Sequence, residues 1–311
     1  MLVGTTAACG RSHGLPSEEE AKAAPRDAAP AAASSAEPRP PADAGSRREL
    51  PRGGRTVFPR HRLVGFCGTP GAPELGRLTG NLGARARAIE ALAREYGGDR
   101  VTLPVFELIA VVVQGAPGPD GKHRRRVGDD VVERYLDAAR AAKAILLLDI
   151  QPGRSDFLTE AKRFERWLRE PDVGLALDPE WAMTGKEQPG ARFGQASGAE
   201  IMTVARWLSA LVEAEDLPEK VLVFHQVNDR VLRDEPALGA SPGVVLVKSV
   251  DGLGPRANKV RTYDHLVKAM PAGVHAGFKL FFDEDTRDHA RLMTPPEVLR
   301  LVPVPEYVMY E

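Results

Sequence analysis

The stretch that decides the fold runs from residue 144 to 181 and reads AILLLDIQPGRSDFLTEAKRFERWLREPDVGLALDPEW. Two short aliphatic runs, 144–150 and 173–177, flank a longer segment in which apolar and charged residues follow helical spacing. A continuous aliphatic run of this length is typical of a strand buried on both faces, as in a parallel sheet. The stretch therefore predicts a strand, a covering helix over 155–170 that Ser155 caps, and a second parallel strand.

The same strand–helix unit recurs along the chain from residue 60 onward. Eight aliphatic runs are predicted as strands: 62–67, 102–113, 144–150, 173–177, 220–227, 243–250, 273–282 and 306–310. Most are followed by an amphipathic stretch: 81–97, 127–143, 155–170, 198–215, 257–270 and 294–302. Eight such units favour an α/β protein built as a closed (β/α)8 barrel, the TIM-barrel fold. An open doubly wound sheet is the alternative, but GFCGTPGAPELG (65–76) lacks the G-x-G-x-x-G spacing of a dinucleotide-binding turn.

The first 55 residues differ in composition from the rest. Residues 10–55 are rich in Ala, Pro, Ser, Glu and Arg, so they predict a disordered tether before a single barrel domain at 56–311. The start, MLVGTTAACG, lacks the basic region and long apolar run of a full signal peptide. Its residues 6–10, TAACG, resemble a bacterial lipobox, in which small residues precede a lipidated cysteine. That resemblance implies lipidation of Cys9, a membrane anchor, and an extracytoplasmic location in the bacterial cell envelope, lipid-anchored or secreted.

The overall composition is that of a soluble globular domain. Apolar residues make up 43% of the 311 residues, charged residues 27%, and the net charge is -1. This balance indicates no nucleic-acid partner, and we interpret the basic run KHRRR (122–126), which has no interleaved aromatics, as solvated surface. The two cysteines, Cys9 and Cys67, are too few for a disulfide framework. Because no cofactor motif and no H-x-H or H-E-x-x-H spacing occurs, we expect neither a cofactor nor a metal.

The active site of such a barrel lies at the C-terminal ends of its strands, so polar residues that end the aliphatic runs predict its position. The predicted site residues are Glu107, Asp149, Asp178, Glu180, Trp181, His225, Gln226, Lys248 and Lys279. Asp178 and Glu180 are two apart on an extended chain, so both project to the same side. With Asp149 from the neighbouring strand, three carboxyls meet in one region. Repulsion between like charges raises the pKa of one of them, which suits a general acid.

The sequence LALDPEW (175–181) resembles the D-x-E ending of strand four in barrel glycosidases of the chitinase and barrel-type lysozyme superfamilies. The resemblance implies hydrolysis of a carbohydrate, with Glu180 as the general acid and Asp178 assisting it. The two earlier aspartates of the chitinase pattern D-x-x-D-x-D-x-E are replaced by Val173 and Ala176. Glycoside hydrolysis uses two carboxyl groups, and Asp149 is the predicted second one. The remaining predicted site residues, Glu107, Trp181, His225, Gln226, Lys248 and Lys279, are expected to contact the substrate.

The sequence leaves three other functions open. A tethered barrel that binds an envelope carbohydrate without cleaving it would have the same Trp181 and the same carboxylates. Lys248, on the sixth predicted strand, stands where class I aldolase barrels carry a Schiff-base lysine. Glu107, Asp149 and Glu180 with His225 also suit Mg²⁺ or Ca²⁺ in a metal-dependent phosphodiesterase.

Overall fold

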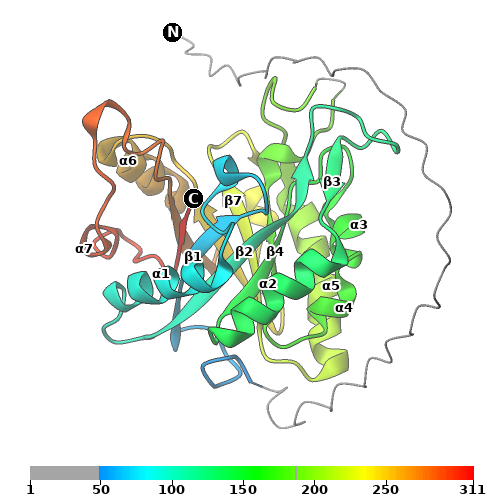
Figure 1. Ribbon diagram of the computed structural model, residues 1–311. Coiled ribbons are helices and arrows are strands. Elements are labelled where there is room, and N and C mark those ends of the chain that lie inside the picture. Colours follow the sequence, from blue (N-terminus) through cyan, green and yellow to red (C-terminus); the bar gives the residue numbers. More distant parts are fainter. Residues whose placement is uncertain (1–48, 186–187) are drawn as a thin grey trace, which may run out of the picture. The chain divides into compact units, whose positions relative to one another are not determined.

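The computed structural model describes residues 49–185 and 188–311, and within them eight parallel strands close into a ring (Figure 1). The barrel strands are β1 (His61–Gly68), β2 (Val101–Val113), β4 (Ile145–Ile150), β5 (Val173–Leu177), β7 (Lys220–Gln226), β9 (Val244–Val250), β10 (Val274–Leu280) and β11 (Tyr307–Tyr310). The ring closes because β1 pairs with both β11 and β2. The predicted (β/α)8 barrel is therefore confirmed, and each predicted aliphatic run forms one of its strands.

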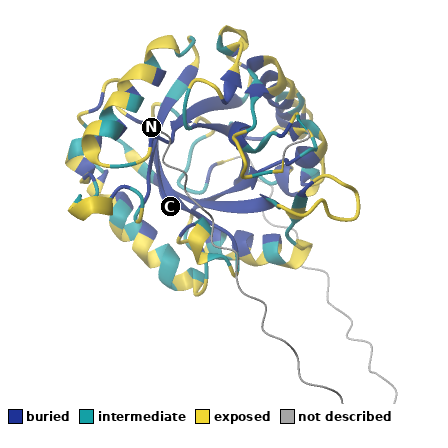
Figure 2. Cartoon of the chain, turned by 90° about the horizontal axis from the view of Figure 1, so that it is seen from above, coloured by how far each residue is buried: buried dark blue, intermediate teal, exposed yellow. Residues whose placement is uncertain are grey.

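Helices cover the outside of the barrel, with exposed outer faces around a ring of buried strands (Figure 2). The α-helices are α1 (Leu82–Glu95), α2 (Asp129–Ala141), α3 (Phe157–Lys162), α4 (Glu165–Leu168), α5 (Gly198–Glu215), α6 (Arg256–Leu266) and α7 (Pro295–Val298). The short 3₁₀ helices are η2 (Pro73–Leu75), η3 (Pro179–Trp181), η4 (Glu235–Ala237), η5 (Val267–Ala269) and η6 (Arg287–His289). None of the helices within the described residues is long and apolar enough to cross a membrane.

Side-chain caps mark the start of α1, α3 and α5, whereas α2, α4 and α6 begin without one. At α5 the Ser197 hydroxyl accepts a hydrogen bond from the backbone N–H of Glu200, and the Glu200 carboxylate accepts one from the backbone N–H of Ser197. The single helix predicted over 155–170 is instead two short helices, α3 and α4. The first begins one residue later than predicted, because Asp156 rather than Ser155 accepts the capping hydrogen bond.

Successive residues of each strand face opposite sides of the barrel wall. On β7, Val221 and Val223 join the apolar cluster of the barrel interior, whereas Leu222 and Phe224 join the cluster between strands and helices. Both sets are buried, because the parallel sheet has its own interior on one side and the helices on the other. The wall therefore places alternate residues of every strand end into the interior.

The N-terminal end of the barrel is closed by the segment 49–60. Leu50 and Val57 of this segment join the apolar cluster of the barrel interior. Hydrogen bonds fix it across the barrel: an Arg52 Nη1–H donates to the carbonyl of Thr102 (3.0 Å), and the backbone N–H of Val57 donates to the Glu219 carboxylate (2.7 Å). Residues 49–55, which the sequence analysis assigns to the tether, thus pack against the barrel. Cys9 and residues 10–48 of the predicted tether lie outside the described residues.

Three further short strands, β3, β6 and β8, lie outside the ring of eight barrel strands. β3 (Arg124–Arg126) pairs antiparallel with the far end of β2, which continues past the barrel rim to Val113. β6 (Ala196–Ser197) and β8 (Leu232–Arg233) form a two-residue parallel pair that joins the loops after β5 and β7. These additions all extend the loops that follow barrel strands, which is the end where the predicted site lies.

Candidate active site

At the C-terminal ends of the strands the barrel interior changes from apolar to polar. On β2 the apolar Val105 is followed two positions later by Glu107, and on β4 Leu147 is followed by Asp149 in the same way. The residues of this buried polar layer, called the interior cluster below, are Glu107, Asp149, Asp178, Glu180, His225, Asp251 and Lys279. All but Asp251 are among the residues predicted from the sequence, so strand-end position and alternation bring most of the predicted site together.

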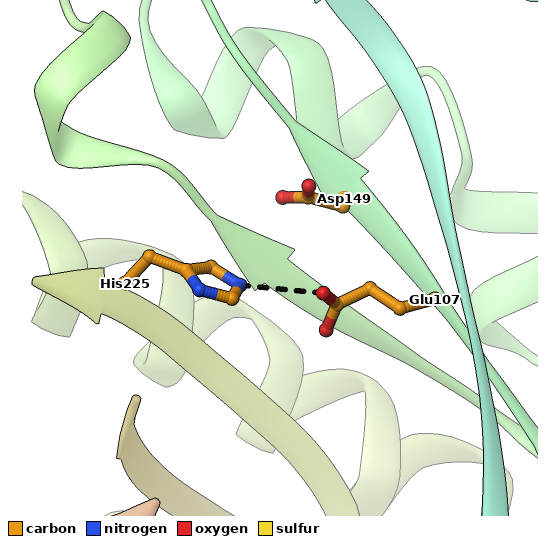
Figure 3. A group of neighbouring side chains, drawn as sticks. All are labelled: Glu107, Asp149 and His225. Carbon is orange, nitrogen blue, oxygen red and sulfur yellow. Dashed lines mark ion pairs between the residues drawn. The ribbon is translucent and has the colours of Figure 1, made fainter. Parts of the chain in front are cut away.

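His225 lies in the middle of the interior cluster. Its Nδ1 is 2.8 Å from one oxygen of Asp251, whose other oxygen accepts a hydrogen bond from the Ser249 hydroxyl (2.7 Å). Its Nε2 faces Glu107 Oε1 at 3.5 Å (Figure 3) and Asp178 Oδ1 at 4.0 Å. Burial disfavours the imidazolium, but the surrounding carboxylates outweigh this effect and raise the pKa of His225 well above its usual value.

Glu107 is held from the opposite side by Tyr307. The phenol of Tyr307, at the start of β11, donates a hydrogen bond to Glu107 Oε2. This leaves Glu107 Oε1 directed toward His225. Tyr307 is not among the residues predicted from the sequence, because a tyrosine in an aliphatic strand has the pattern of an ordinary core residue. Its alternation with Met309, which also faces the interior, is the signal that places it there.

Lys279 is the one lysine of the interior cluster, and it forms ion pairs with two carboxylates. Its Nζ is 2.7 Å from Glu311 Oε2 and 3.5 Å from Asp251 Oδ2. Although burial opposes ionisation, the charges of His225 and Lys279 lower the pKa of Asp251 to about 2. This lowered pKa favours the ionised form of Asp251, which lies between His225 and Lys279.

The Asp178 and Glu180 pair sits where the backbone leaves the barrel wall. β5 ends at Leu177, and Pro179 begins η3, so the chain is not extended over both residues as predicted. Both side chains are nevertheless buried, with exposed fractions of 5% and 6%. The Gln151 amide donates a hydrogen bond to Asp178 Oδ2 (3.0 Å), which fixes that carboxyl toward β4.

Two carboxyls of the interior cluster are strongly disfavoured as anions. Burial, together with the nearby charge of Asp178, raises the pKa of both Asp149 and Glu180 well above the usual range. Asp178 also has a raised pKa because it is buried, although His225 and Lys279 oppose that shift. A carboxyl that stays protonated near neutral pH can donate a proton, which is the property required of a general acid.

Four buried polar atoms of the interior cluster have no hydrogen-bond partner in the part of the chain that the structure describes. They are Glu107 Oε1, Asp149 Oδ1, Glu180 Oε2 and His225 Nε2. Buried polar atoms in folded proteins are almost always paired, and an unpaired one costs about 1–3 kcal/mol. Their gathering at the strand ends of the barrel marks this place as one arranged for a ligand or substrate rather than for stability.

Three of the predicted site residues lie elsewhere. Gln226 follows His225 directly, so it faces away from the barrel interior, where its amide donates to the carbonyl of Asn228 (3.4 Å). Lys248 also lies on the helix side of the wall and forms an ion pair with Glu235. Trp181 ends η3 at the rim and is partly exposed. The structure therefore gathers the acids and His225 but leaves Gln226 and Lys248 outside their cluster.

A cavity of about 480 Å³ lies at the rim next to η3. It is lined by residues 183–185 and 192–195 together with Asn228 and Arg230. The loop that forms it is tied to η3, since the backbone N–H of Gly194 donates to the carbonyl of Glu180 (2.6 Å). Phe193 in this loop is 50% exposed, so its ring is available to a ligand in the cavity.

The fold and the interior cluster define a (β/α)8-barrel protein with a buried, acid-rich site at the strand ends. No protein-family model matches the chain, and no curated protein matches it. Among solved structures, the chain is similar to the apo form of a 3-keto-D-glucoside 4-epimerase from E. coli, with 16% sequence identity and a TM-score of 0.34. That match covers 79% of this chain and 90% of the epimerase. The site residues therefore carry the functional argument.

Proposed function

We propose that this protein is a glycosidase-like hydrolase of a carbohydrate, with Glu180 as general acid and Asp178 assisting it. The observation that carries the proposal is the Glu180 carboxyl, which is buried just after the end of β5 and whose Oε2 has no hydrogen-bond partner among the described residues. Asp178 is two residues away and also buried. A protonated carboxylic acid with a free oxygen in a water-poor site is suited to protonating the oxygen of a leaving group.

In the proposed reaction Glu180 gives its proton to the glycosidic oxygen as the bond to the sugar breaks. Asp149 is the second carboxyl, which attacks the sugar or activates a water molecule. Asp149 has to lose its own proton to solvent before this step, and the positive charge that develops on the sugar ring in the transition state then stabilises its carboxylate. If Asp149 attacks the sugar, the water that later breaks the sugar–Asp149 bond returns a proton to Glu180. If Asp149 activates the water instead, Asp149 takes that proton and Glu180 regains one from solvent.

The rim cavity supports a carbohydrate as the substrate. Its volume suits a small ligand, and its lining combines the exposed ring of Phe193 with the polar side chains of Asn228 and Arg230. Trp181 lies at the same rim, three residues before Thr184 of the cavity wall. An aromatic face with a few polar groups is the pattern that binds a sugar ring, whose CH faces stack while its hydroxyls form hydrogen bonds.

The test compares Glu180→Gln with the wild type on a panel of envelope and environmental polysaccharides, with release of reducing ends as the measurement. We expect the variant to lose at least about 100-fold in turnover, because the amide cannot donate the proton of a general acid. Glu95→Gln, on the exposed side of α1, is the matched control and should keep full activity. Equal turnover by Glu180→Gln and the wild type contradicts the assignment, and binding without turnover by both favours a carbohydrate-binding protein instead.

We also propose that the barrel works in the bacterial cell envelope, tethered through a lipidated Cys9. The support is the lipobox-like sequence TAACG (6–10) and the Ala/Pro-rich stretch that follows it. Mass spectrometry of the membrane fraction tests this part separately. An unmodified Cys9 there contradicts the anchor but leaves the proposed chemistry untouched.

A further inference from the structure

We propose that Glu107, Asp149 and His225 form a binding site for one divalent cation. The three residues come from three different barrel strands, β2, β4 and β7, and their side chains point toward one another (Figure 3). One ligand atom from each, two carboxylate oxygens and an imidazole nitrogen, lie within 4.8 Å of one another. Ligand atoms at this spacing reach a common ion after small side-chain rotations, since each has to lie about 2.0–2.2 Å from it.

The atoms that face the proposed site are only loosely paired, since His225 Nε2 lies 3.5 Å from Glu107 Oε1 and 4.0 Å from Asp178 Oδ1. Glu107 Oε1, Asp149 Oδ1 and His225 Nε2 are all buried and form no hydrogen bond within the described residues. Glu107 and His225 are completely inaccessible, and Asp149 is 2% exposed. A cation that accepts one lone pair from each residue, with loss of the proton on Nε2, satisfies all three atoms at once.

The contacts behind the ligands direct these atoms inward. Tyr307 donates to Glu107 Oε2, which leaves Oε1 for the ion. Asp251 lies 2.8 Å from His225 Nδ1 and holds a hydrogen on that nitrogen, so Nε2 is the nitrogen that gives up its proton to a bound cation. A carboxylate that orients a histidine in this way is a recurring feature of protein metal sites.

The number of carboxyl groups in the interior cluster favours a cation as well, because a bound cation stabilises their ionised forms. Asp178, Glu180 and Asp251 add carboxyls around the proposed ligands, whereas the one lysine, Lys279, is already committed to Glu311 and Asp251. Carboxylates suit Mn²⁺, and imidazole suits Zn²⁺ and Fe²⁺, so this mixed ligand set selects an ion of that size over Ca²⁺. Three protein ligands leave further coordination positions for water or substrate.

The inference does not depend on hydrolysis by Glu180. It gives Asp149 a different role from that in the proposed function, as a ligand rather than as the second carboxyl. A cation binding assay tests the cation site without any substrate. The turnover of Glu180→Gln tests the proposed hydrolase function. Failure of one therefore leaves the other standing.

The experiment is calorimetric titration of the chelator-treated full-length protein with Mn²⁺ and with Zn²⁺. We expect one equivalent to bind to the wild type and to Glu95→Gln. We expect weaker binding in each of the three ligand variants, Glu107→Gln, Asp149→Asn and His225→Gln. The loss of affinity should exceed the roughly 10- to 100-fold that is typical when a residue that only supports a metal ligand is removed. Circular dichroism checks that each variant is folded.

A thermal measurement keeps the inference testable when a variant fails to fold. Binding to the native state alone raises the unfolding temperature of the wild type with increasing Mn²⁺ or Zn²⁺, and the Asp149→Asn protein should show little of this rise. Absence of both heat and a thermal shift in the wild type at millimolar Mn²⁺ and Zn²⁺ overturns the site. Binding of the cation with wild-type affinity by all three ligand variants also overturns the site.

Discussion

Glu160 is a buried carboxylate whose neighbours explain a basic stretch of the sequence. It is fully inaccessible and accepts hydrogen bonds from Arg124 Nε (2.9 Å) and from Arg126 Nε (2.6 Å) and Nη2 (3.0 Å). Both arginines belong to the run KHRRR, interpreted from the sequence as solvated surface. Arg125 between them faces the other way on β3 and is exposed. The run is thus a short edge strand in which alternate arginines neutralise one buried acid.

Replacing Glu160 by Gln should lower the free energy of unfolding by about 3 kcal/mol, because Arg126 loses its counter-charge and Arg124 keeps only the more exposed Asp120. Urea unfolding of the variant and the wild type measures this. Glu165→Gln is the control, since the pair that Glu165 forms with Arg169 is partly exposed and should change stability by at most about 0.5 kcal/mol. Similar losses in the two variants contradict the prediction.

The pH dependence of the free energy of unfolding of the wild type and Glu160→Gln gives a second measurement. Hydrogen bonds from the arginines lower the pKa of Glu160 although burial opposes the shift. A lowered pKa stabilises the folded state above the unfolded pKa of about 4.3, and the gain is lost as the pH falls through the folded value. The difference in stability between wild type and Glu160→Gln should therefore shrink below about pH 4.

Strand alternation explains which site residues the sequence places correctly. His225 and Gln226 are adjacent, so only one of them can face the barrel interior, and the same alternation puts Ser249 inside and Lys248 outside. In a parallel barrel both faces of a strand are apolar, so the sequence of one strand does not reveal which parity is interior. For that reason Asp149 and His225 were predictable as strand-end residues, whereas the outward position of Lys248 required the structure.

At the scale of elements, β1 and β2 approach each other unusually closely. Gly65 pairs in register with Val105. A Cβ built on Gly65 would lie 2.0 Å from the carbonyl oxygen of Val105, far inside any real contact. Because the obstacle is backbone, it cannot rotate away, and the spacing of these two strands depends on the glycine.

Gly65→Ala should destabilise the protein by at least about 2 kcal/mol, because the two strands have to move apart within a closed ring. The matched control is Gly83→Ala near the start of α1, where the added Cβ meets only side-chain atoms at 3.4 Å or more. That substitution should stabilise the protein by about 0.5–1 kcal/mol through helix propensity. Thermal unfolding compares the two, and equal effects of the same sign contradict this account of β1.

Strands were easier to predict than helices in this chain. Each aliphatic run is buried on both faces, so its composition alone marks it as a strand. The stretch 155–170 has helical spacing throughout but divides at Arg163 and Phe164, where the local backbone hydrogen bonds become those of a tighter turn. Such a break depends on how Phe164 and Trp167 pack against the barrel, which the local pattern does not contain.

At the scale of the whole molecule, Lys220 couples global stability to pH. It is buried at the start of β7, and its Nζ donates to the carbonyls of Glu170 and Val173. Burial lowers the pKa of Lys220 to about 7. Below pH 7 the lysine is charged in both the folded and the unfolded states, so the cost of burying the charge is fully present. Between about pH 7 and 10.4 only the unfolded state holds the proton, and stability rises with pH.

Lys220→Met should remove this dependence. The free energy of unfolding of the wild type is expected to gain up to about 1.4 kcal/mol per pH unit from Lys220 in that window, whereas the variant lacks this gain. Urea unfolding at pH 7, 8 and 9 measures both slopes. Lys162→Met, at an exposed position of α3, serves as the control and should keep the wild-type slope. Identical slopes for Lys220→Met and the wild type would falsify the buried-lysine account.

The closed barrel was predictable because eight similar units leave few other ways to bury eight strands on both faces. The role of residues 49–60 was not predictable, since their composition continues that of the stretch before them. Leu50 and Val57 are two apolar residues among Pro, Arg and Gly, and only the docked structure shows that they fill the base of the barrel. The buried contacts of Leu50 and Val57 therefore decide that this stretch packs on the barrel, although its overall composition predicts a tether.

Because the segment 49–60 closes the N-terminal end of the barrel, the interior opens only at the C-terminal ends of the strands. Below the interior cluster, aliphatic side chains from the strands and from the segment 49–60 occupy the core completely. Any molecule that reaches His225 or Glu180 has to come in past the rim. Under the proposed hydrolysis, substrate and product therefore share this one passage between the rim loops.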